Sequence, residues 1–221
     1  MNAVEQIISK QVEWAKNRGI RLIGSQGERG RKVYTTELRE NLFQPLSSQG
    51  RTDFEGGDGG ELTGEKSRPA KMQALHSSSA LGVNIFDYWR MSSDLSTIAS
   101  SCGLSKKGRV FSGDIRFEYK FPIDDRFKFA PNLDVVILPQ SRTYKCYAIE
   151  CKFTEAYAGY SHGGFDPKYF DNEDVWDGLS DTKLLANNIS PDDERFKYLH
   201  AAQLIKHILG LNREFGKNQY R

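Results

Sequence analysis

The sequence lacks any apolar run near the roughly 18 to 20 residues that a helix needs to span a bilayer. Its first residues also lack an uninterrupted apolar stretch, because Glu5 and Glu13 fall within them, so no secretory signal is indicated. Cysteine is scarce, with three residues and no CxxC pair. This excludes a disulfide framework and argues against structural zinc, and we expect a cytoplasmic protein with no membrane partner.

A dominant charge of one sign is also lacking, since 31 basic and 29 acidic side chains leave a formal net charge of only +2. Any binding of nucleic acid must therefore depend on local sites. The glycine-rich segment at 56–60 has no following Gly-Lys-Ser/Thr, so it is not a P-loop, and no Gly-x-Ser-x-Gly nucleophile turn occurs. The chain does have 38% hydrophobic residues over 221 positions, enough for one core of moderate size.

The apolar periodicity predicts an α/β domain in which helices flank three successive strands. We expect an N-terminal helical and loop extension over 1–69 and a core over 70–221, or one compact domain containing both. A fourth strand would be expected after the last helix, but the sequence stops at Arg221. We therefore expect either that the chain is truncated or that its last strand is supplied from elsewhere. The expected helices are 2–17, 35–43, 70–90, 94–101 and 192–214, the expected strands are 110–121, 133–138 and 144–153, and 50–69 is expected to be a loop.

Two of the expected strands, PNLDVVILPQ and YKCYAIECKF, are apolar on both faces except where Asp134, Glu150 and Lys152 interrupt them. Buried charge is costly unless it is paired or bound to a metal. A hairpin centred on Arg142 places Asp134 directly opposite Glu150, with Lys152 on the same face. Two such carboxylates can chelate Mg²⁺ or Mn²⁺, and the lysine can orient or help deprotonate a water or stabilise developing charge. The alternative is a structural ion pair.

The acid at 134 followed by Glu150-Cys151-Lys152 on the next strand resembles the PD-(D/E)xK nuclease superfamily. The resemblance covers about residues 70–215. The Pro-Asp pair of the motif is not adjacent here, since residues 131–134 read PNLD. The segment LHSSSALGVNIFDYW, which precedes FEYKF and IECKFTE, is also similar to bacterial restriction-endonuclease-like proteins of that superfamily.

The resemblance implies a restriction-endonuclease-like core with a mixed, mostly antiparallel central sheet flanked by helices. It also implies a metal-dependent endonuclease acting on nucleic acid, foremost DNA, in restriction, defence or repair. Asp134 and Glu150 would then bind Mg²⁺ or Mn²⁺, and Lys152 would be the catalytic lysine. A homodimer is a further expectation, because many nucleases that cut both strands are dimers.

The same resemblance implies that further polar residues lie near this site. Glu118, on the first strand, either completes the metal shell or faces solvent. Glu61, at the end of the glycine-rich loop, is either a metal ligand or a solvated acid. Gln203 is either a catalytic residue beside the site or an amide on the flank of the last helix.

Several other polar residues favour structural interpretations. Asn84 is expected to bond a neighbouring backbone group rather than to reach the site. His200 and His207 are expected to be solvated or to act as caps. The basic clusters at 29–32 and 106–109 either contact phosphate or are solvated, and the aromatic stretch at 156–170 either stacks on bases or, as we favour, covers the core.

Three other functions fit the same residues. The first is a nucleic-acid-binding module of the same fold that has lost its activity. The second is a ribonuclease that uses the same chemistry. The third is an unrelated α/β protein in which the lysine and a carboxylate form a structural ion pair.

Overall fold

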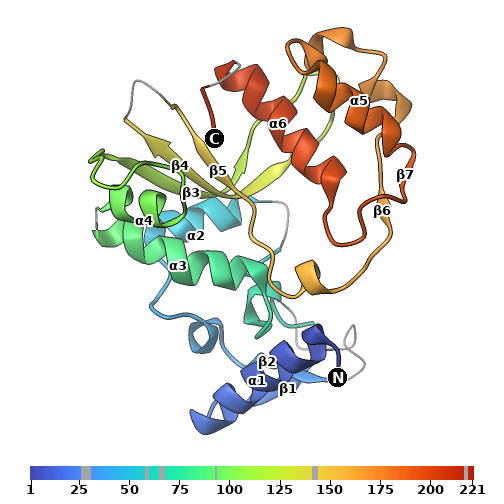
Figure 1. The fold of residues 1–221 in the computed structure, drawn as a ribbon. Helices are drawn as coiled ribbons and strands as arrows, with labels where there is room; N and C mark the ends of the chain where they lie inside the picture. The colour runs from blue at the N-terminus through green and yellow to red at the C-terminus, as the bar shows by residue number, and fades with distance from the viewer. Residues whose placement is uncertain (26–30, 58–59, 65–67, 93, 141–143, 217–218) are drawn as a thin grey trace.

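The computed structural model has a central sheet with helices on both faces (Figure 1). No helix in the part of the chain it describes is long and apolar enough to cross a membrane. The described residues are 1–25, 31–57, 60–64, 68–92, 94–140, 144–216 and 219–221.

The central sheet consists of β3 (Gly113–Lys120), β4 (Asn132–Pro139) and β5 (Tyr147–Ile149), which pair antiparallel in that order. Residues 219–221 run parallel to β5 along its outer edge. The Ala148 N–H donates to the Arg221 carbonyl at 2.8 Å, so the expected fourth strand is present as a short segment. The sheet is thus mixed and mostly antiparallel, as expected.

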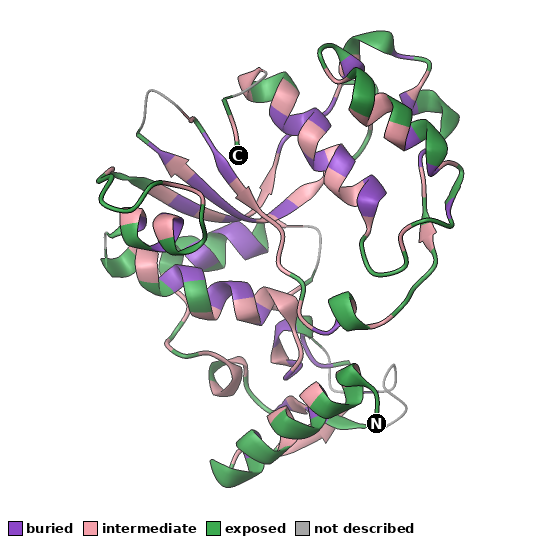
Figure 2. Ribbon diagram, in the orientation of Figure 1, coloured by how far each residue is buried: buried purple, intermediate pink, exposed green. Residues whose placement is uncertain are grey.

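One face of the sheet packs against α2 (Ser48–Glu55), α3 (Ser78–Ser92) and α4 (Leu95–Ser101). The other face packs against α6 (Ala201–Phe215), which in turn contacts α5 (Ser180–Asn188). Figure 2 shows the buried residues concentrated on the strands and on the sheet-facing sides of α3 and α6. The expected α/β class is therefore confirmed.

Glycine lets both of these helices approach the sheet closely. A Cβ at Gly210 of α6 would stand 2.3 Å from the carbonyl oxygen of Phe121, just beyond β3. A Cβ at Gly82 of α3 would stand 3.3 Å from the sulfur of Cys151, just beyond β5. Larger residues at these positions would push α6 and α3 away from the strand ends that carry the charged residues.

The N-terminal segment contributes α1 (Ala3–Asn17), β1 (Leu22–Gly24) and β2 (Lys32–Thr35). Asn2 and Glu5 form a capping box at the start of α1, which explains why the expected helix begins there. Most of α1 is exposed (Figure 2), and β2 is tied to the core by a 2.9 Å hydrogen bond from the Leu75 N–H to the Val33 carbonyl.

The expectation of a loop over 50–69 is wrong for its first residues, because α2 occupies 48–55. Ser47 caps this helix by accepting a hydrogen bond from the Gly50 N–H at 3.0 Å. Gly50 is typical of a loop in the sequence, yet here it allows close packing, since a Cβ at this position would stand 2.9 Å from the Arg90 side chain. Phe54 is buried in the core on the α3 side of the sheet.

Two other helices begin later than expected because hydrogen bonds outside the helix take their backbone groups. Helix 70–90 begins at Ser78, after the short 3₁₀ helix η3 (Lys71–Gln73), and the Met72 N–H donates to the Glu61 carbonyl. Helix 192–214 begins at Ala201, since Asp193 accepts from the N–H groups of Arg195 and Phe196 at 2.9 Å.

The remaining differences are small shifts in length. The expected helix 35–43 is the 3₁₀ helix η2 (Leu38–Asn41), and the expected strand 144–153 is regular only over β5. Asp192–Asp193 form the short strand β7, which pairs with β6 (His162–Gly163). Three further 3₁₀ turns are η4 (Glu155–Tyr157), η5 (Pro167–Tyr169) and η6 (Glu173–Trp176).

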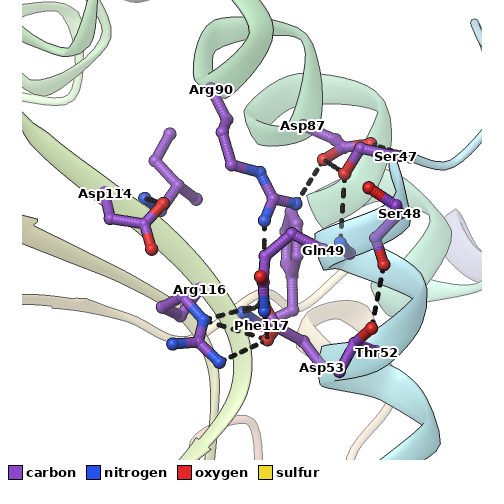
Figure 3. Close-up of polar contacts among 12 residues, drawn as sticks. Ser47, Ser48, Gln49, Thr52, Asp53, Asp87, Arg90, Asp114, Arg116 and Phe117 are labelled. Carbon is purple, nitrogen blue, oxygen red and sulfur yellow. Dashed lines mark hydrogen bonds and ion pairs between the residues drawn. The ribbon is translucent and has the colours of Figure 1, made fainter.

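A buried polar network joins α2, α3 and β3 (Figure 3). The Asp53 carboxylate is 1% exposed and accepts from the Arg116 guanidinium at 2.7 and 2.9 Å and from the Phe117 N–H at 3.1 Å. Arg90 lies 3.8 Å from the same carboxylate and pairs with the buried Asp87. The network satisfies charges that would otherwise be too costly to bury, so it fixes α2 against β3.

Removing one member of this network should destabilise the fold. We expect Asp53→Ala to lower the free energy of unfolding by about 2–4 kcal/mol, because it leaves Arg116 without its buried carboxylate and leaves Arg90 with Asp87 alone. Glu55→Ala is a matched control on the same helix, since Glu55 is exposed and its nearest cation is 3.9 Å away. Urea unfolding measures both variants. Equal stability of the two would contradict this account of the network.

Candidate functional site

Three carboxylates stand in a row across the three strands of the central sheet. In the pairing of β3 with β4, Phe117 lies opposite Val135 and Tyr119 lies opposite Leu133. Glu118, between Phe117 and Tyr119, therefore lies opposite Asp134. In the pairing of β4 with β5, Val135 lies opposite Ile149. The same register places Asp134 opposite Glu150, which is one residue past the end of β5. The predicted hairpin register is therefore confirmed, and the same register brings in Glu118.

Glu150 is the most heavily contacted of these carboxylates. Its Oε1 accepts hydrogen bonds from Lys152 Nζ at 2.6 Å and from Gln203 Nε2 at 2.7 Å. Its Oε2 lies 3.2 Å from His207 Nε2, at ion-pair distance but without the alignment of a hydrogen bond. Burial acts to raise the pKa of Glu150, but the contacts with His207 and Lys152 outweigh it, so the pKa is lowered and the carboxylate stays ionised.

Asp134 is held by the backbone of the following strand. Its Oδ2 accepts from the Cys151 N–H at 2.6 Å, which fixes the carboxylate beside the Glu-x-Lys segment. Burial, together with repulsion from Glu150, raises the pKa of Asp134 to about 6. The sequence therefore places negative charge here against an electrostatic cost, a common property of functional sites.

Glu118 sits in a strained backbone conformation. Its φ is 47°, and no other non-glycine residue among those described has a positive φ. A side chain in this region costs free energy, and such strain clusters at functional sites. Its carboxyl accepts from Asn132 Nδ2 at 3.0 Å, and burial followed by repulsion from Asp134 and Glu61 raises its pKa to about 7. Glu118 thus faces the other acids rather than open solvent.

Glu61 approaches from the segment that precedes η3. Its side chain is only 12% exposed, lies 3.5 Å from Lys71 Nζ and repels Glu118. It is therefore not the solvated loop acid of the alternative interpretation. Across the described ranges, no three His, Cys, Asp or Glu side chains are grouped closely enough to hold a metal ion as they lie.

The last helix brings two side chains to Glu150. Gln203 donates to it directly, which excludes the flank position considered from the sequence. His207 is one helical turn further along α6, and its side chain is 5% exposed. The expected solvated or capping role is therefore wrong for His207. The signal was its spacing of four residues from Gln203, which puts both on one helical face.

Other described candidates do not contact the three carboxylates. Asn84 accepts from the Phe43 N–H at 2.6 Å and donates to the Asn41 carbonyl at 3.0 Å, so it has the expected structural role. His200 precedes α6 and stacks on His162, with ring centroids 4.7 Å apart. Residues 29–30 lie outside the described part of the chain. The segment 106–109 lies between α4 and β3, at the opposite end of the strands from Glu150.

Glu118 yields a prediction about pH. Its folded pKa of about 7 exceeds the ordinary value of 4.5, so its stabilising neutral form is lost as pH rises through 7. We expect Glu118→Gln to raise the melting temperature of the metal-free protein at pH 8 by roughly 2 to 6 °C, for about 1 to 2 kcal/mol. The gain should shrink steadily as pH falls towards 4.

Thermal melts from pH 4 to pH 8 test this, with Glu214→Gln on the exposed side of α6 as the control. Equal melting temperatures of Glu118→Gln and wild type at pH 8 would contradict the raised pKa of Glu118.

Comparison with known proteins places this geometry in a family. No curated protein and no solved structure matches the chain. A family model described as "Restriction Endonuclease associating with ARP" matches residues 8–220, nearly the whole chain and all of the strands and helices described above except the first turn of α1. The chain therefore belongs to this restriction-endonuclease family.

Proposed function

We propose that this chain is a metal-dependent endonuclease that hydrolyses phosphodiester bonds of DNA through a PD-(D/E)xK site. The observation that carries the proposal is the row of Glu118, Asp134 and Glu150 across three strands, with Lys152 bonded to the last of them. Membership of a restriction-endonuclease family supports nucleic acid as the substrate. The same membership supports a role in restriction, defence or repair.

The carboxylates fit a hard divalent cation such as Mg²⁺ or Mn²⁺, which prefers oxygen ligands. Burial first, and then repulsion from neighbouring carboxylates, raises the pKa values of Asp134 and Glu118, and a bound cation would relieve that repulsion. Glu150 Oε2 accepts no hydrogen bond, although His207 Nε2 lies 3.2 Å away, so it has lone pairs to offer a cation. We assign Asp134 and Glu150 as ligands, with Glu118 and Glu61 as further acids. When bound, the ion would supply an activated water and neutralise phosphate charge.

Lys152 is suited to stabilise negative charge on the phosphate. Burial acts to lower its pKa, but the hydrogen bond to Glu150 outweighs this, so the pKa is raised and the ammonium stays charged at neutral pH. Its side chain is 37% exposed, enough for a substrate to reach it. A charged ammonium donates protons rather than accepting them, so the role of general base is less suited to it.

Gln203 and His207 are assigned as positioning residues because both act on Glu150. The amide of Gln203 holds Oε1, and His207 stands against Oε2. Together these two residues of α6 contact both oxygens of the Glu150 carboxylate. Loss of either contact would let Glu150 rotate away from Asp134, and small displacements of this kind reduce catalysis.

The proposal predicts metal-dependent cutting of plasmid DNA. We expect activity with Mg²⁺ or Mn²⁺, none with a chelator, and at least a 100-fold loss in Lys152→Ala and Asp134→Ala, roughly the size expected when a catalytic group is removed. Lys145→Ala is the matched control, since this exposed lysine lies at the opposite end of β5. Circular dichroism and thermal melts verify that each variant is folded.

The outcomes separate the alternatives. Cutting of RNA but not of DNA would assign a ribonuclease. Binding of DNA without cutting, and without calorimetric binding of Mn²⁺ that depends on Asp134, would assign an inactive binding module. Full activity of Lys152→Ala would contradict the proposal that this site catalyses the reaction.

A further inference from the structure

A pocket of about 180 Å³ opens directly beside the proposed catalytic groups. Glu150, Lys152 and Gln203 form one side of it. Its other walls come from two segments distant in the sequence, one around β6 and one just before α6. Besides the acid Glu155, these walls carry rings and aliphatic groups, namely Tyr160, His162, Tyr198, Leu199, His200 and Leu204.

The two segments are fastened to each other, so the pocket walls are preformed. β6 pairs with β7, and the Tyr160 N–H donates to the Lys197 carbonyl at 3.0 Å. A Cβ at Gly159 would stand 3.7 Å from the ring of Tyr198, so the two segments pack side by side here. His162 and His200 stack with an interplanar angle of 16° and make a flat wall. A site already ordered binds a ligand with a smaller entropic cost.

The aromatic rings at the mouth are not needed by the core. Within the stretch 156–170, Phe165 and Tyr169 are buried and cover the core, as favoured from the sequence. Tyr160 is 55% exposed and Tyr198 is 64% exposed. Exposed rings that border a pocket next to charged groups are a common feature of sites that stack nucleic-acid bases.

We propose that this pocket receives one unpaired nucleobase of the nucleotide next to the scissile phosphate. The inference rests on the proposed nuclease function and names its substrate class: nucleic acid with a single-stranded, bulged or extruded nucleotide at the cut. A paired base in a duplex is stacked between its neighbours and has no free face for the tyrosine rings. A base in the pocket would bring its own phosphate towards Lys152, which borders both the pocket and the carboxylates.

The test compares cleavage of a single-stranded oligonucleotide, a fully paired duplex and a duplex with a one-nucleotide bulge. We expect preference for the unpaired substrates. Tyr198→Ala should raise their KM by about 5- to 150-fold, the equivalent of the 1–3 kcal/mol that one stacked base contributes. Tyr198→Phe keeps the ring and should stay within about twofold of wild type. Tyr157→Ala is the matched control, since Tyr157 is an exposed tyrosine of the stretch 156–170 that does not line the pocket.

A second readout does not require cleavage. Single-stranded oligonucleotides with 2-aminopurine at one position are titrated with the protein, because stacking on a ring quenches this fluorescent base. We expect quenching in wild type and in Tyr198→Phe, and its loss in Tyr198→Ala.

The failures of the two proposals are distinguishable. Cleavage of paired and unpaired substrates with equal KM, unchanged by Tyr198→Ala, would overturn the pocket and leave the nuclease standing. Absent cleavage with quenching that depends on Tyr198 would support the pocket in a binding module. Absent quenching would overturn the pocket whatever the cleavage result.

Discussion

The site depends above all on the register in which β4 pairs with its two neighbours. Side chains alternate between the two faces of a strand, so a slip of one residue would turn Asp134 away from Glu118 and Glu150. The register is secured by the apolar residues around the acid: Val135 and Ile137 are buried towards α3, and Val136 is buried towards α6. The hydrophobic core therefore selects the one pairing that brings the three carboxylates together.

That pairing concentrates negative charge where little water reaches it, and α6 supplies the compensation. Gln203 and His207 both contact Glu150, and Gly210 on the same helix lets α6 lie against the end of β3. The compensation is uneven. Glu150 has a lowered pKa, whereas Asp134 and Glu118 have raised ones. Burial and, after it, repulsion between carboxylates account for the two raised values, and a divalent cation bound as we propose would relieve the repulsion.

The sequence was sufficient to predict the α/β class, the hairpin register and the cluster of Asp134, Glu150 and Lys152. These follow from local pattern, since period-two alternation and the short distance between strands determine pairing. It could not predict where the helices near residues 70 and 192 begin. The Met72 N–H bonds to the carbonyl of Glu61, and the Asp193 carboxylate accepts from the N–H groups of Arg195 and Phe196, so these groups are taken before the helices start. The backbone strain at Glu118 was also out of reach, since a glutamate carries no signal for a positive φ.

The buried Asp53 network explains how that strain is sustained. Asp53 accepts from the backbone N–H of Phe117, the residue immediately before Glu118, and binds the side chain of Arg116 as well. Gly57, just after α2, leaves room for the side chain of Glu118, since a Cβ there would stand 3.2 Å from it. The partners are about 60 residues apart in the chain, so no local pattern reveals them. A strained residue persists only where its surroundings are over-determined. The hydrogen bonds of Asp53 to the two residues before Glu118, and the close approach of Gly57, hold β3 in the conformation that Glu118 adopts.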